Sequence, residues 1–201
     1  MSTLKKSNKK KEVKKLYLFG PIEFATGSGQ DNWRQRLQAI LAGMFNRDFT
    51  FTLEYIDPRD VSHKVGTDIG ENMQFAARVK TAEQWELFDP FMDSVWKQDI
   101  INVDAAHVLV SWVETEDDLV SLCGSVGSFR EVQRAQEQGK PVFLISPGPH
   151  TKASSHFLHM LRSHGKSHGY PAMVKTPEEF AEALYTWIIN SRRMRMFREM
   201  Q

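Results

Sequence analysis

Short apolar segments alternate along this chain with longer segments whose apolar residues recur at helical spacing. The short ones have the length and composition of strands and lie at 15–19, 49–55, 106–113, 141–146 and 172–174. Between them, helical patterns follow Asp31, extend over 129–138 and 156–163, and begin again at Thr176-Pro177. Strands that alternate with helices predict an α/β domain built on a largely parallel sheet. We expect this domain to span residues 16–190.

Residues 58–90 form an unusually long connection between the second and third expected strands. They contain a helix-prone stretch from about Glu71 to Phe88, and a further helical pattern runs from Pro90 to Val103. Connections between a strand and a helix are usually much shorter. We therefore interpret 58–90 as an insertion or lid beside the site.

The formal net charge of +1 is the sum of unlike parts. Residues 1–15 contain seven lysines and one glutamate, and residues 191–201 contain four arginines and one glutamate. The two ends therefore carry +6 and +3, which leaves −8 on residues 16–190. An acidic body does not favour a dedicated nucleic-acid surface, although contact with nucleic acid through the basic ends is possible. We expect 1–15 to be a disordered arm and 191–201 a basic tail.

Several protein classes are disfavoured by composition. The single cysteine excludes a disulfide scaffold and a zinc site built from cysteines. No apolar run approaches the roughly 20 residues of a membrane span, and the N-terminal lysines are not followed by an apolar stretch. We expect a cytoplasmic protein that does not contact membranes.

Ligands of open parallel sheets bind beyond the carboxyl ends of the strands. Three connections rich in glycine or hydroxyl residues belong to that edge, at 20–29, 114–128 and 146–155. In the second, an acidic loop leads to Gly124–Ser128, directly before the helix expected from Phe129. Amides and hydroxyls at the start of a helix favour an anion such as phosphate, although this loop alone is equally compatible with an ordinary turn.

Two carboxylates lie near this edge. Glu131 falls in the first turn of the helix after the glycine-rich loop, where it either complements the helix dipole or acts as a nucleophile toward an electrophilic sugar carbon. Asp99 precedes the core strand at 106–113, where it is either a solvated helix residue or a second acid that protonates a leaving group. The histidine-rich stretch from His156 to His168 has one i, i+3 pair and no adjoining carboxylate, so no metal site is expected.

Three sequence motifs resemble the nucleoside 2-deoxyribosyltransferases. Tyr17-Leu18-Phe19-Gly20-Pro21-Ile22 is similar to the first strand and turn of that family. Gln98-Asp99 with the strand at 106–110 resembles its aspartate-bearing helix and the next strand. Gly127-Ser128-Phe129-Arg130-Glu131, followed by Gly139-Lys140-Pro141-Val142, resembles its glutamate-bearing helix and the strand that follows. Order and spacing agree over most of residues 16–146.

The resemblance implies a flavodoxin-like (Rossmann-like) parallel five-stranded sheet with helices on both faces. It also implies cleavage of an N-glycosidic bond without metal or cofactor. Glu131 would attack C1′ of the sugar, Asp99 would protonate the base, and Tyr17 would position Glu131 or the sugar. Gly20, Pro21, Ile22, Gly127 and Ser128 would contact the substrate. Attack on the glycosyl-enzyme by a second base gives transfer, and attack by water gives hydrolysis.

Ser125 marks a departure from the family members that act on free nucleosides, which carry an aspartate at this position. The related 2′-deoxynucleoside 5′-monophosphate N-hydrolases carry serine there. An aspartate would repel a phosphate dianion, whereas a hydroxyl at a helix N-terminus would bind it. Ser125 therefore favours a nucleotide substrate over a free nucleoside. The resemblance further implies a homo-oligomer.

Two alternatives stay open from the sequence. One is a non-catalytic nucleotide-binding module that docks through its basic ends. The other is an enzyme that cleaves a larger nucleotide such as NAD, enclosed by residues 58–90.

Overall fold

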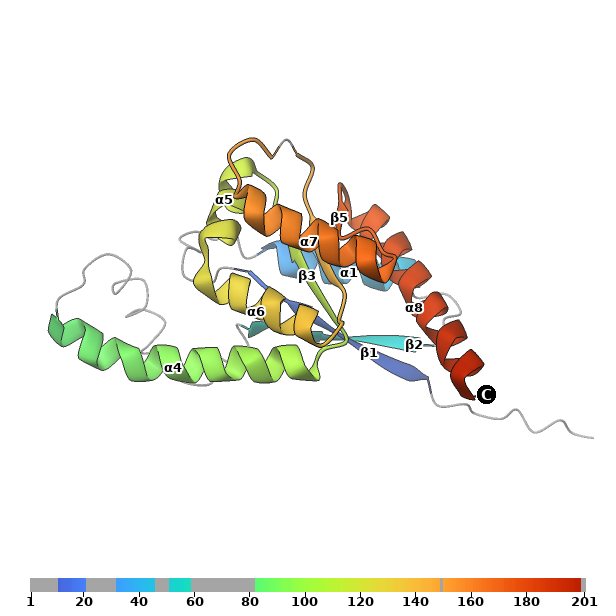
Figure 1. Cartoon of the computed structure of the whole chain (residues 1–201), viewed down its shortest axis with the longest axis horizontal. Coiled ribbons are helices and arrows are strands. Elements are labelled where there is room, and N and C mark those ends of the chain that lie inside the picture. The colour runs from blue at the N-terminus through green and yellow to red at the C-terminus, as the bar shows by residue number, and fades with distance from the viewer. Residues whose placement is uncertain (1–10, 21–31, 46–50, 59–81, 149, 200–201) are drawn as a thin grey trace, which may run out of the picture.

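The computed structural model describes residues 11–20, 32–45, 51–58, 82–148 and 150–199 (Figure 1). Expected site residues Pro21 and Ile22 lie outside these ranges, as does most of the expected lid at 58–90. The elements, in chain order, are β1 (Glu12–Leu18), α1 (Asn32–Phe45), β2 (Phe51–Ile56), α4 (Ala82–Ala105), β3 (Val108–Trp112), α5 (Glu116–Gly124), α6 (Val126–Glu137), β4 (Val142–Ile145), α7 (Ser155–His168), β5 (Met173–Val174) and α8 (Pro177–Glu199).

The five strands form one sheet in the order β2-β1-β3-β4-β5, and every neighbouring pair is parallel. This is the flavodoxin-like order, whose direction reverses between β1 and β3. All five strands lie where apolar segments predicted them. The expected α/β fold and its parallel five-stranded sheet are therefore confirmed.

Helices cover both faces of this sheet. In Figure 1, α6 and α7 cross in front of the strands, whereas α1 lies behind them. The helix α4 packs along α6, and α1 packs against α8. The central strands β3 and β4 are almost entirely buried because they are covered from both sides, as parallel sheets require, whereas the edge strand β2 buries only Phe51. Their carboxyl ends and the adjoining helix ends form the edge at which the sequence placed a site.

At both basic ends of the chain, residues 12–15 and 191–199 belong to regular elements. Strand β1 begins at Glu12 and pairs with β2 from that residue onward, so 12–15 belong to the sheet rather than to a disordered arm. At the other end, α8 continues through the basic residues to Glu199. The two ends meet, because the Glu12 carboxylate lies 2.9 Å from Lys14 Nζ and 2.8 Å from Arg192 Nη2. One lysine of the N-terminal stretch, Lys14, is therefore buried in the sheet.

The segment expected as an acidic loop is the helix α5. Thr115 caps it: the Thr115 hydroxyl accepts a hydrogen bond from the Asp118 amide, and the Asp118 carboxylate accepts one from the Thr115 amide. Acidic residues in a first helical turn complement the helix dipole, so the cluster starts a helix instead of preventing one. Consequently α6 also starts earlier than expected, at Val126, and includes Gly127 and Ser128.

Two further helices are longer than predicted. The single helix α4 continues across Pro90, where the missing amide hydrogen forgoes one backbone hydrogen bond, whereas the sequence suggested a break. The helix α7 extends to His168 and ends at Gly169, whose φ of 70° is left-handed. In the described part of the chain, no helix is both long and apolar enough to cross a bilayer.

Candidate active site

Glu131 lies on the buried stripe of α6, together with Ser128, Val132 and Ala135. Spacings of three and four residues bring these side chains to one face of a helix. A glutamate at that position is carried under the surface along with its apolar neighbours, and Glu131 is only 6% exposed. A carboxyl buried in this way costs free energy unless it has a polar partner.

The partner is Tyr17, a completely buried residue near the carboxyl end of β1. Its hydroxyl donates a short hydrogen bond to Glu131 Oε1, and Asp99 Oδ1 on α4 lies 3.2 Å from the same hydroxyl oxygen. One strand and two helices thus bring together the three residues that the sequence proposed as catalytic. Two oxygens that both bond to one hydroxyl oxygen lie at most about 6 Å apart.

The three groups perturb each other's proton affinity. Burial and then the charge of Asp99 raise the pKa of Glu131, while the Tyr17 hydrogen bond and the charge of Arg34 oppose the rise. Burial also raises the pKa of Asp99, against a lowering by the Tyr17 hydrogen bond. Burial and both neighbouring carboxylates raise the pKa of Tyr17, which keeps its hydroxyl protonated at neutral pH.

The Tyr17 hydroxyl has one proton for two carboxyl groups. Both contacts are full hydrogen bonds only when one carboxyl is protonated and donates to the tyrosine oxygen while the tyrosine donates to the other. The raised pKa values of Glu131 and Asp99 favour this singly protonated pair at neutral pH. A pair of acids that shares one proton is suited to a division between acid and nucleophile.

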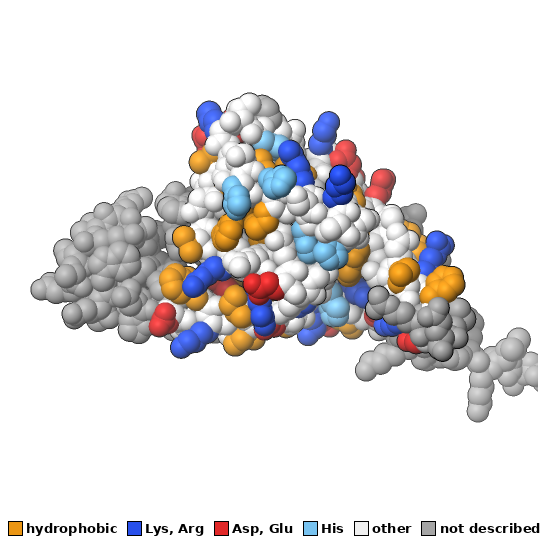
Figure 2. Space-filling view, viewed as in Figure 1, with side chains coloured by type: hydrophobic (Ala, Val, Ile, Leu, Met, Phe, Trp, Pro, Cys, Tyr) orange, Lys and Arg blue, Asp and Glu red, His pale blue; other side chains and the backbone are white. Residues whose placement is uncertain are grey.

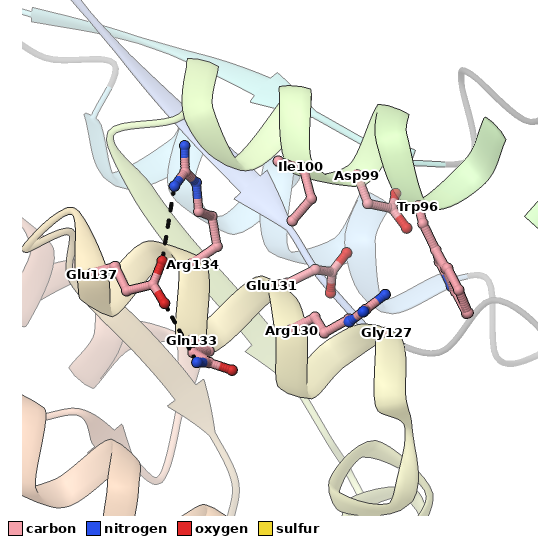
Figure 3. A pocket seen from close by; sticks show the side chains of 9 residues that line it. All are labelled: Trp96, Asp99, Ile100, Gly127, Arg130, Glu131, Gln133, Arg134 and Glu137. Carbon is pink, nitrogen blue, oxygen red and sulfur yellow. Dashed lines mark hydrogen bonds and ion pairs between the residues drawn. The ribbon is translucent and has the colours of Figure 1, made fainter. Parts of the chain in front are cut away.

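A cavity of about 220 Å³ opens between α4 and α6 above this triad. Figure 3 shows Asp99 and Glu131 facing each other across it from the two helices. Besides the two acids, its lining includes one aromatic and two basic side chains: Trp96, Arg130 and Arg134. The cavity therefore gives a ligand access to both acids.

The two arginines of the cavity differ in their contacts. Arg134 forms an ion pair with Asp104, at 2.8 Å between Nε and Oδ1, and lies 3.8 Å from Glu137. Arg130 instead stacks its guanidinium over the indole of Trp96, with 5.0 Å between Cζ and the ring centroid. Trp96 is 36% exposed, so the Trp96–Arg130 pair presents a planar surface to the cavity.

Ser125 lies between two helices as the C-cap of α5 and the N-cap of α6. Its hydroxyl accepts a hydrogen bond from the Ser128 amide at 3.3 Å. Gly127 lines the cavity, whereas Ser125 and Ser128 lie at the same helix end without lining it, and Ser128 is buried. Of the expected substrate contacts on α6, Gly127 is thus the one that the structure brings directly to the cavity.

Gly20 follows β1 at the same edge and has a φ of 149°, a conformation that favours glycine. A Cβ at this position would lie 3.4 Å from the Ser111 hydroxyl and 3.6 Å from Arg34 Nη2. The backbone therefore approaches two polar side chains closely where β1 ends. Gly20 is absent from the cavity lining and shapes the turn next to it.

Arg34 is a residue of this edge that sequence reasoning missed. It is 3% exposed, and its Nε donates to the Leu18 carbonyl at 3.2 Å. A usable signal was present, because Arg34 shares the i, i+3, i+7 stripe of α1 with Leu37 and Leu41, where a charged residue is unexpected. Its partner Asp57, just after β2, could not be found in this way.

Histidines gather along α7 (Figure 2). His164 contacts the Lys140 carbonyl oxygen at 3.0 Å, and the rings of His164 and His168 lie 4.1 Å apart. In the described ranges, no group of three or more His, Cys, Asp or Glu side chains is arranged to hold a metal ion. His164 thus contacts the chain before β4, whereas His156 stacks against Phe129 of α6, with 6.4 Å between the ring centroids.

Comparison of the chain with protein-family models and with curated proteins finds no match.

Proposed function

We propose that this protein cleaves the N-glycosidic bond of a nucleoside 5′-monophosphate or nucleoside, with Glu131 as the nucleophile. The observation that carries the proposal is the buried Tyr17 hydroxyl in contact with both Glu131 and Asp99. Glycosidases that form a covalent intermediate place their two carboxyl groups about 5–5.5 Å apart, whereas those that act through a water need about 6.5 Å or more. Because one hydroxyl contacts an oxygen of each carboxyl group, the two groups are close neighbours, which supports direct attack by Glu131.

In the first step, a Glu131 oxygen forms a bond to C1′ while the bond from C1′ to the base nitrogen breaks. The Asp99 carboxyl gives its proton to the departing nitrogen, so the base leaves in its neutral form. The sugar remains as an ester of Glu131. In the second step, water or another base attacks C1′, the ester bond breaks, and Asp99 takes up the proton released by the attacking group.

This sequence requires Glu131 ionised and Asp99 protonated, although burial raises the pKa of Glu131. The Tyr17 hydroxyl can redistribute the shared proton. If Glu131 holds it, the Glu131 carboxyl donates to the tyrosine oxygen while the tyrosine hydroxyl gives its own proton to Asp99. The net result is an ionised nucleophile and a protonated acid, with the tyrosine unchanged.

The cavity supports a planar ligand. The exposed indole of Trp96 lies one helical turn before Asp99 on α4, so a base stacked there would have its glycosidic nitrogen near the acid. The start of α6, with Ser125 and Gly127, supplies hydroxyl and amide groups for a 5′-phosphate on the opposite side of the sugar. Nucleotides are therefore the favoured substrate class, and hydrolysis and base transfer both fit the site.

The test is incubation of the full chain with a panel of nucleosides and their 5′-monophosphates, with and without an acceptor base. Chromatography then measures released or exchanged base. We expect release from at least one nucleotide, and no release by Glu131→Gln. Saturable nucleotide binding without release from any substrate would instead indicate a non-catalytic binding module.

A further inference from the structure

A buried ion pair lies at the carboxyl edge of the sheet, beside the candidate site. The guanidinium of Arg34, from α1, lies 3.7 Å from the Asp57 carboxylate, which follows β2, and both side chains are less than 10% exposed. Replacing a buried ion pair with packed apolar residues is often neutral or stabilising, so stability alone does not account for such a pair. Its location at the edge of the site suggests a role there.

Arg34 also holds the chain that follows β1. Its Nε donates to the Leu18 carbonyl at 3.2 Å, and its Nη2 donates to the Gly20 carbonyl at 3.4 Å. These carbonyls flank the segment that leaves β1 directly after Tyr17. The fork of an arginine can satisfy two carbonyls and a carboxylate together, which a lysine could not do with the same geometry.

The charge of Arg34 acts on Glu131 as well. Both side chains are buried, so the Arg34 guanidinium is shielded from water. In that environment a positive charge is weakly screened, so it favours the ionised form of a nearby carboxyl. The charge of Arg34 opposes the rise in the pKa of Glu131 that burial produces.

We propose that Arg34 is a positioning residue of this site, which fixes the turn after β1 and keeps the Glu131 carboxyl available as a nucleophile. This inference rests on the proposed function, because that function assigns Glu131 the role of nucleophile. The effect of Arg34 on the proton affinity of Glu131 can nevertheless be measured without any substrate.

Other charged groups also face Glu131. Tyr17 comes from β1 and Asp99 from α4. The cavity is also lined from α6 itself by Arg130, Arg134 and Glu137. Among the described residues, α5 and β4, which also pack on α6, contribute no charged side chain to the cavity lining. Tyr17 and Asp99 contact the Glu131 site directly and must stay unchanged in the experiment.

The experiment titrates the Glu131 carboxyl by NMR in protein labelled at the glutamate side-chain carboxyl carbon. The signal is assigned by its absence from Glu131→Gln. In Arg34→Met, we expect the proton affinity of Glu131 to rise at least about threefold. In Asp57→Asn, which removes the counter-charge of Arg34, we expect it to fall. These opposite signs cannot both arise from a general loss of structure.

Lys14→Met is the matched control. Lys14 is likewise a buried cation on β1, paired with a carboxylate, but it lies at the amino end of the sheet. We expect no change in the Glu131 titration in this variant. If Arg34→Met does not fold, Asp57→Asn decides the question alone, since an unchanged or higher proton affinity there overturns the proposal.

The outcomes separate this inference from the proposed function. An unchanged titration in Arg34→Met, together with base release by the native chain, would remove the role of Arg34 and leave the function in place. The expected shifts without base release from any substrate would retain the electrostatic coupling and overturn the glycosidic function.

Discussion

Tyr17 and Glu131 are 114 positions apart in the sequence, yet the tyrosine hydroxyl donates a hydrogen bond directly to the glutamate carboxyl in the buried centre of the site. The contact joins β1, at one side of the point where strand order reverses, to α6, the second of the two helices between β3 and β4. Ligands of doubly wound sheets bind at this point. The bond therefore connects the fold to the proposed chemistry, and its two ends can be tested separately.

Glu131→Gln should abolish base release and raise stability at alkaline pH. Burial raises the pKa of Glu131 above its ordinary value of 4.5, so ionisation costs the folded state free energy. The stability that the protonated Glu131 carboxyl gives the folded state is fully present below its ordinary pKa of 4.5 and is lost as the pH rises through its folded-state pKa. Glutamine does not titrate and still accepts from Tyr17, so we expect a gain on the order of 1–3 kcal/mol at pH 9.

Urea unfolding at pH 4 and pH 9 measures this gain. Glu137→Gln is the control, because Glu137 also lines the cavity from α6 but is exposed. It should show no pH-dependent gain and should retain activity. Equal stability of native protein and Glu131→Gln at pH 9 would contradict the buried, destabilised carboxyl.

Tyr17→Phe should slow base release by about 100-fold or more, because the two acids lose the hydroxyl that redistributes their proton. The lost hydrogen bond normally lowers the pKa of Glu131, so the pH at which the rate is half-maximal should move upward as well. Stability should fall by about 1–3 kcal/mol, since the buried Glu131 carboxyl and the half-buried Asp99 carboxyl lose a donor.

Tyr170→Phe separates catalysis from stability. The Tyr170 hydroxyl is buried too, and it accepts a hydrogen bond from the Val142 amide at 2.9 Å, away from the site. We expect a comparable stability loss in this variant and an unchanged pH–rate profile. If the two variants showed the same rate, Tyr17 would have a structural role only.

The sequence predicted most of the fold because apolar segments mark buried strands wherever they occur. Strand β4, for example, consists of four buried apolar residues between Pro141 and Ser146. An apolar run this short has the length of a strand and is too short for a typical helix. Two of the errors arose where charge was taken as a sign of an irregular segment. Lys14 is buried by pairing with a distant strand, and the acids after Thr115 start a helix. Such outcomes depend on partners that local composition does not reveal.

The candidate site, too, was predicted where local sequence was sufficient and missed where distant partners decide. The short sequence motifs and the family resemblance predicted Tyr17, Asp99 and Glu131 as site residues. In the structure, the Tyr17 hydroxyl contacts both carboxyl groups. Arg34 could have been noticed as a charge on an apolar stripe, but its partners Leu18, Gly20 and Asp57 come from two other segments. Only the folded sheet brings those segments together.

Ser125→Asp should weaken the use of nucleoside monophosphates more than that of free nucleosides, by about tenfold or more in kcat/KM. Aspartate caps a helix as well as serine does, so α6 should still form. A carboxylate beside the site for phosphate would repel the dianion, whereas a free nucleoside carries no such charge. The measurement is base release from matched pairs of nucleoside and monophosphate.

Ser154→Asp provides a matched control for that substitution. Ser154 is the N-cap of α7, and its hydroxyl accepts from the Phe157 amide as the Ser125 hydroxyl does from Ser128. This variant should leave the preference between nucleoside and nucleotide unchanged. An equal loss on both substrate classes in Ser125→Asp would count against a phosphate at the start of α6.

Two truncations should separate the N-terminal lysines from the sheet. Removal of residues 1–10 ends before β1, so stability and turnover should stay close to those of the full chain. Removal of 1–14 deletes the β1 residues paired with Phe51, Thr52 and Leu53, together with the Glu12 contacts to α8. We expect the second truncation to lose on the order of 2 kcal/mol or more of unfolding free energy, since backbone groups of β2 lose their partners.

Urea unfolding and base release per folded molecule measure both effects. Equal stability of the two truncated chains would show that β1 contributes nothing before Lys15, and loss of turnover in the first would assign residues 1–10 to the site.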